Sequence, residues 1–68
     1  MADPTQTTRI GPLEREMLHR VNSSWGLEDR LIALSRQRDA IARCGNKGLA
    51  ILEGGKWFVT PEGMEILA

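Results

Sequence analysis

Residues 48–63 decide the fold of this chain and read Gly-Leu-Ala-Ile-Leu-Glu-Gly-Gly-Lys-Trp-Phe-Val-Thr-Pro-Glu-Gly. Two apolar runs flank Gly54 and Gly55, and such a pair is typical of a tight hairpin turn because both turn positions need positive φ. Thr60 then fits the N-cap of a helix, and Pro61 fits its first position, where the missing N–H costs nothing. The stretch therefore predicts a β-hairpin that leads directly into a final helix.

Two further helices are predicted from the apolar spacing nearer the N-terminus. The first begins at Pro12, because Leu13, Met17 and Val21 recur at the four-residue spacing of one helical face. Glu14 is expected to point outward from this helix. After a polar break, an apolar stripe in residues 27–34 predicts a second helix of about two turns.

A third helix is predicted from Ser35, which fits its N-cap, through roughly Asn46, where neighbouring glycines suit a helix C-terminus. The predicted order is helix-helix-helix-strand-strand-helix, a mainly α fold with a small β-hairpin and therefore of the α+β class. Residues 1–9 are polar and lack periodicity, so they are predicted to form a disordered tail. Residues 10–68 are predicted to form one domain.

The composition is that of an ordinary globular domain, with 68 residues, 41% hydrophobic and 26% charged. No apolar run approaches the ~18 residues of a membrane span, and the first residues lack the basic-then-apolar pattern of a signal peptide. The single cysteine cannot form an internal disulfide. We therefore expect a cytoplasmic protein without a membrane partner.

The formal net charge is zero, which argues against strong generic binding to nucleic acid. The charges are unevenly placed, however, because residues 30–56 hold six basic side chains and only two acidic ones. Such a segment either forms one basic face or consists of solvated helix surfaces.

Three segments carry a resemblance to a known family. Residues 41–49 read Ile-Ala-Arg-Cys-Gly-Asn-Lys-Gly-Leu, residues 53–56 read Glu-Gly-Gly-Lys, and residues 57–63 read Trp-Phe-Val-Thr-Pro-Glu-Gly. They resemble the end of the recognition helix, a short wing and the return strand of winged helix-turn-helix DNA-binding domains. The last two are similar to the wing region of multiple-antibiotic-resistance-type regulators. This resemblance implies a winged-helix fold that reads DNA with its third helix.

The outward face of that third helix is the candidate DNA-reading surface. Arg36 and Arg43 have the chemistry to read guanine, Asn46 can read adenine, and Ser35 at the helix N-terminus can hold a phosphate. Asp39 lies in the middle of this face, where it either contacts a base or pairs with neighbouring arginines to leave a neutral surface. The predicted DNA-binding residues are Ser35, Arg36, Arg38, Arg43, Asn46, Lys47 and Lys56.

Three other residues invite a functional interpretation. Cys44 is expected to be a small buried hydrophobe, because nothing beside it in sequence would activate its thiol. Trp57 is expected to pack against the helices. Trp25 is either a lid over the small core, which is the favoured interpretation, or an exposed anchor for a partner.

The sequence therefore supports two hypotheses of different classes. The first is a small DNA-binding protein, a transcriptional regulator or accessory factor that binds double-stranded DNA as a homodimer or beside a larger protein. The second is a protein-binding winged helix, an adaptor or small inhibitor that docks on a larger assembly. No catalytic motif, metal-ligand set or cofactor motif is present, so we predict no enzyme activity and no cofactor.

Overall fold

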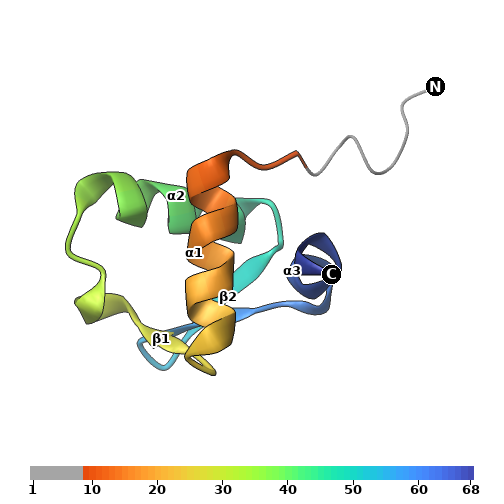
Figure 1. The fold of residues 1–68 in the computed structure, drawn as a ribbon. Coiled ribbons are helices and arrows are strands. Elements are labelled where there is room, and N and C mark those ends of the chain that lie inside the picture. The colour runs from red at the N-terminus through yellow and green to blue at the C-terminus, as the bar shows by residue number, and fades with distance from the viewer. Residues whose placement is uncertain (1–8) are drawn as a thin grey trace.

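The computed structural model describes residues 9–68, which form an α+β domain with three α-helices and a three-stranded antiparallel sheet (Figure 1). The helices and strands follow one another in the order α-β-α-β-β-α. The elements are α1 (Pro12–Ser23), β1 (Leu27–Glu28), the 3₁₀ helix η2 (Asp29–Leu31), α2 (Ser35–Asn46), β2 (Ala50–Glu53), β3 (Lys56–Val59) and α3 (Pro61–Leu67). The tail predicted for residues 1–9 lies outside the described residues, except for Arg9.

The core lies where α1 and α2 meet the inner face of the sheet, whose strand order is β1-β3-β2. Along β3 the side chains alternate, so that Trp57 is buried while Phe58 is exposed on the outer face. Figure 1 shows α3 beside α1, near the end of the hairpin. The fully buried large side chains are Met17, Leu18, Val21, Ile32, Ile41, Cys44 and Leu49. Among residues 9–68, no helix combines the length and the apolar character that a membrane crossing requires.

The prediction of a second helix in residues 27–34 is wrong. Leu27 pairs with Trp57 of β3 as part of the short strand β1, and a single 3₁₀ turn follows it. Of the apolar stripe only Leu27 and Ile32 are buried, whereas Leu31 and Leu34 are about half exposed. Pairing with a strand some 30 residues further along the chain takes the place of the predicted helix. The spacing of apolar residues within 27–34 does not reveal such a partner.

The predicted hairpin and final helix are confirmed. Gly54 and Gly55 form the turn with φ of 58° and 78°, values that L side chains rarely adopt. The Thr60 hydroxyl caps α3 by accepting the Gly63 N–H at 3.1 Å. Gly63 lies so close to the Leu49 carbonyl that a Cβ at this position would collide with it. Glycine is therefore required where α3 begins, a need that the sequence did not reveal.

The first and third predicted helices are also confirmed, as α1 and α2, with one correction at the start of α2. Ser35 is the first helical residue, and Leu34 takes the N-cap position without a side-chain hydrogen bond. The backbone N–H groups of Gln37 and Arg38 both donate to the Leu34 carbonyl at 3.0 Å. The Ser35 hydroxyl is thus not the cap that we expected.

Candidate functional site

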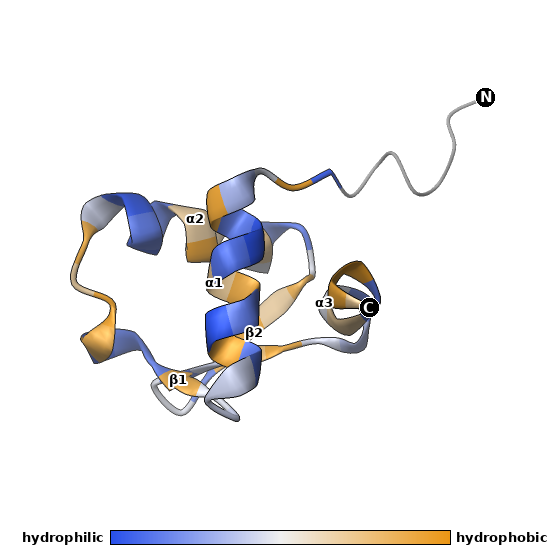
Figure 2. Cartoon of the chain, viewed as in Figure 1, coloured by the Kyte–Doolittle hydropathy of each residue, from blue (hydrophilic) through white to orange (hydrophobic). Residues whose placement is uncertain are grey.

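The outward face of α2 is exposed over its whole length, as the sequence predicted. Its inner face is buried through Ala40, Ile41 and Cys44, which anchor the helix on the core. Figure 2 shows hydrophilic residues along much of α1 and α2, and apolar residues in β3 and α3. The exposed residues of this face are Ser35, Arg36, Asp39, Ala42, Arg43 and Asn46. A partner therefore has free access to the side of α2 that holds most of the predicted DNA-binding residues.

Arg38 is used inside the domain to hold η2 against α2. Its guanidinium donates to the Asp29 carboxylate at 3.0 Å and to the carbonyls of Asp29 and Ile32 at 3.1 and 3.0 Å. Asp29 also accepts the indole N–H of Trp57 at 2.9 Å. These hydrogen bonds, first from Trp57 and then from Arg38, lower the pKa of Asp29 below its ordinary value, against an opposing effect of burial.

Glu14 does not point outward as predicted, because it is buried with only 7% of its surface exposed. Its carboxylate accepts the Gly11 N–H at 3.2 Å, which is the N3 half of a capping box at the start of α1, since Gly11 has no side chain to supply the other half. The same carboxylate accepts Lys47 Nζ at 2.7 Å and lies 3.8 Å from Arg43 Nε. The spacing of residues within α1 did not reveal that Glu14 is buried, because the residues that cover it belong to the end of α2.

The charges around Glu14 determine its protonation. Burial alone would raise the pKa of Glu14, but hydrogen bonds from Lys47 and Gly11 and the charges of Lys47 and Arg43 outweigh it. The resulting pKa lies below the ordinary value, so Glu14 is a carboxylate at neutral pH. Lys47 also donates to the Arg9 carbonyl at 2.7 Å, which ties the segment before α1 to the end of α2.

Asp39 and Arg36 on the outward face of α2, and Lys56 at the hairpin, have different surroundings. Asp39 forms no ion pair within residues 9–68, so the predicted pairing with Arg36 and Arg43 is absent. Arg36 likewise has no ion-pair partner in this part of the chain. Lys56 lies apart from α2 at the hairpin, where its Cα is paired with those of Glu28 and Glu53.

Trp25 is a further residue whose position differs from the favoured prediction. Its side chain is 92% exposed, so the favoured interpretation as a core lid is wrong. The residue follows the C-cap of α1 with φ of 55°, and its N–H donates to the Asn22 carbonyl at 3.2 Å. The Gly26 N–H donates to the Val21 carbonyl at 3.2 Å, which completes a Schellman motif.

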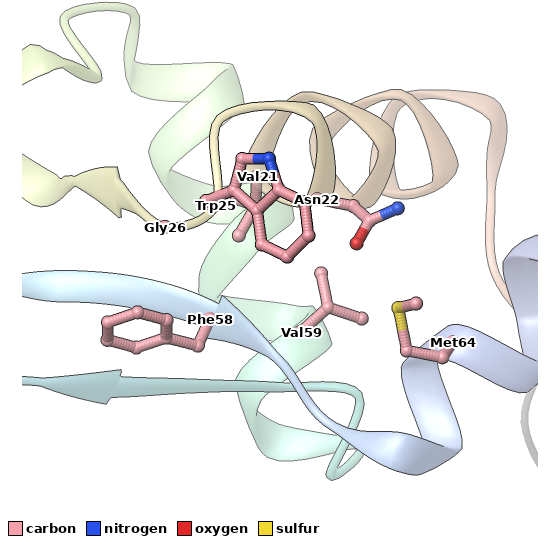
Figure 3. A pocket seen from close by; sticks show the side chains of 7 residues that line it. All are labelled: Val21, Asn22, Trp25, Gly26, Phe58, Val59 and Met64. Atoms are coloured by element: carbon pink, nitrogen blue, oxygen red, sulfur yellow. The ribbon is translucent and has the colours of Figure 1, made fainter.

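Trp25 therefore occupies the position of that motif at which glycine is the favoured residue. An L residue in this left-handed conformation costs roughly 1–2 kcal/mol. The indole lies beside an open pocket of about 370 Å³ between α1, β3 and α3 (Figure 3). The pocket is lined by Val21, Asn22, Trp25, Gly26, Phe58, Val59 and Met64. The lining is mostly apolar and holds no charged side chain.

Cys44 is fully buried, as expected, and its thiol lies 3.6 Å from the Glu14 carbonyl. Burial, together with the nearby charge of Glu14, raises the pKa of Cys44 to about 11, so the thiol is protonated at neutral pH. In the described part of the chain no three His, Cys, Asp or Glu side chains are grouped so that they could hold a metal ion. Comparisons of the chain with models of protein families, with curated proteins and with solved structures found no match.

Proposed function

We propose that this protein is a small winged-helix DNA-binding protein, a transcriptional regulator or accessory factor that reads duplex DNA with α2. The observation that carries the proposal is the division of α2 into a buried apolar face and an uncovered polar face along its whole length. A helix anchored in this way can enter a major groove without disturbing the core. On that face Arg36 and Asn46 would contact base edges.

The arrangement of elements supports the winged-helix interpretation. α2 is followed by the hairpin and by α3, as in the expected arrangement, while β1 and the 3₁₀ turn η2 stand where the second helix was expected. Lys56 at the hairpin would contact a phosphate as the single cation of a short wing. Arg38 and Lys47 at the flanks of α2, and Arg43 on its outward face, would add phosphate contacts, although each already has an intramolecular partner.

The test compares two variants that each remove one positive charge. Arg36→Gln changes the proposed reading face of α2. Arg15→Gln changes α1 instead, where the Arg15 side chain donates to the Ile66 carbonyl of α3. Duplex affinity, measured by fluorescence anisotropy at several salt concentrations, should fall with salt in the wild type. Arg36→Gln should cost about 1–3 kcal/mol at a preferred sequence, and Arg15→Gln much less. Undetectable or salt-independent duplex binding by the wild type would contradict the proposal.

The second candidate function, a protein-binding adaptor, is favoured by the exposure of Trp25. A large aromatic side chain that is held exposed at a conformational cost, beside an uncharged apolar pocket, has the character of a protein-binding anchor. This function predicts a stoichiometric complex that survives moderate salt. Trp25→Ala should abolish that complex and Arg36→Gln should leave it intact. Size-exclusion chromatography of each variant mixed with the purified partner protein measures this. The reverse pattern would argue for the DNA-binding face.

A further inference from the structure

Two of the cations proposed to contact DNA share one buried carboxylate. Lys47 Nζ lies 2.7 Å and Arg43 Nε 3.8 Å from the Glu14 side chain. The Glu14 side chain is only 9% exposed, whereas the side chains of Lys47 and Arg43 are 32% and 54% exposed. The cations therefore face solvent while the carboxylate lies behind them.

We infer that Glu14 is an internal competitor of DNA phosphate, which weakens duplex binding by compensating one of the two positive charges of Arg43 and Lys47 from inside the domain. This inference rests on the proposed DNA-binding function and describes what limits the affinity of the same surface. The carboxylate presents the oxygen atoms and negative charge that a phosphate would offer to the same two side chains. A phosphate that approaches from solvent meets two cations of which one charge is already compensated.

The position of Glu14 makes this compensation permanent in the free protein. The Gly11 N–H holds the carboxylate at the start of α1, and Lys47 is also held by the Arg9 carbonyl. The low pKa of Glu14 keeps its charge at neutral pH. Arg36, on the same helix, has no such partner within residues 9–68 and keeps its full charge for a ligand.

The experiment replaces Glu14 by a side chain that keeps its shape and its cap. Glutamine can still accept the Gly11 N–H through its carbonyl oxygen, whereas its NH2 group cannot accept from Lys47, so Glu14→Gln keeps the cap and removes the charge together with the Lys47 hydrogen bond. Glu16→Gln, at an exposed position of α1, is the matched control because it changes the net charge equally. The probe is a fluorescent mixed-sequence duplex about two helical turns long, titrated with each full-length variant between about 50 and 200 mM salt.

Glu14→Gln should bind this duplex roughly three- to tenfold more tightly than Glu16→Gln at low salt. The slope of log affinity against log salt should become steeper by about one. Equal affinities for the two variants would overturn the inference while leaving the proposed function intact. Loss of binding in every variant, wild type included, would overturn the proposed function itself.

A second comparison keeps the inference testable if Glu14→Gln does not fold. In the wild-type background, Lys47→Gln should cost less affinity than Arg36→Gln, because a Lys47 contact with phosphate must replace its hydrogen bond to Glu14, whereas Arg36 has no ion pair within residues 9–68. Circular dichroism of each variant establishes that it is folded. A larger loss from Lys47→Gln than from Arg36→Gln would overturn the inference.

Discussion

The two tryptophans of this small domain differ in burial and in the contacts that they make. Trp57 is 9% exposed, packs on the backbone of Gly45 and donates its indole N–H to Asp29. Trp25 is almost fully exposed and follows the end of α1 in a left-handed conformation. Trp57 connects β3, α2 and η2, whereas Trp25 borders a pocket that the domain leaves open.

Backbone position, rather than residue type, determines which tryptophan belongs to the core. Strand alternation turns Trp57 inward, and its pairing with Leu27 of β1 places it at the centre of the sheet. The Schellman motif turns Trp25 away from the core, because its backbone is held by Asn22. Stability should therefore depend on one indole and be indifferent to the other.

The largest expected effect comes from removing each indole in turn. Trp57→Ala should lower the free energy of unfolding by about 3–5 kcal/mol, because it leaves a cavity and removes the indole hydrogen bond to the Asp29 carboxylate. Trp25→Ala should change it by less than about 0.5 kcal/mol. Denaturant titration followed by far-UV circular dichroism measures both. If the two substitutions had similar costs, Trp25 would have to pack in solution more than its exposure allows.

An intermediate effect is expected from the glycine beside Trp25. Gly26 has φ of 110°, and a Cβ added to it would lie 2.7 Å from the Phe58 ring, so Gly26→Ala should cost about 1–3 kcal/mol. Gly48→Ala is the matched control, because Gly48 has φ of 76° with open space around it. That variant should show the conformational strain alone, about 1 kcal/mol. Thermal unfolding compares the two, and equal losses would show that the Phe58 ring moves aside freely.

The smallest effect concerns how stability depends on pH through Asp29, the acceptor of the Trp57 indole N–H. The pKa of Asp29 is lowered in the folded state, so the unfolded chain binds its proton more readily. The stabilisation from Asp29 is complete above its ordinary pKa of 3.8 and is lost as the pH falls through the lowered folded-state value. Asp29→Asn should make stability less dependent on pH in this acid range. Denaturant titrations at several pH values measure this, and an unchanged acid dependence would assign the loss to other groups such as Glu14.

Several predictions that rest on local signals are confirmed. The hairpin of Gly54 and Gly55 and the cap at Thr60 depend on turn and cap chemistry within a few residues, and both are confirmed. The buried and exposed sides of α2 follow from helical periodicity and are also confirmed. The candidate surface on α2 was therefore predictable as a surface, although its binding of DNA remains a prediction.

Sequence reasoning failed wherever a distant segment intervened. Residues 27–34 have helical spacing, but β3 recruits their first two residues into the sheet. Glu14 has the spacing of a surface residue, but the end of α2 covers it with Lys47. Neither partner can be read from nearby sequence, because each lies about 30 residues further along the chain.

The sequence by itself thus determined a hairpin that leads into a capped helix, two amphipathic helices before it, and a polar face on the second of them. These features depend on backbone preferences and periodicities that operate over a few residues. Contacts between distant segments alone pair Leu27 with Trp57 in the sheet and place Glu14 behind two of the cations of α2. Those outcomes depend on packing and charge pairing between segments far apart in the chain, which no local pattern contains.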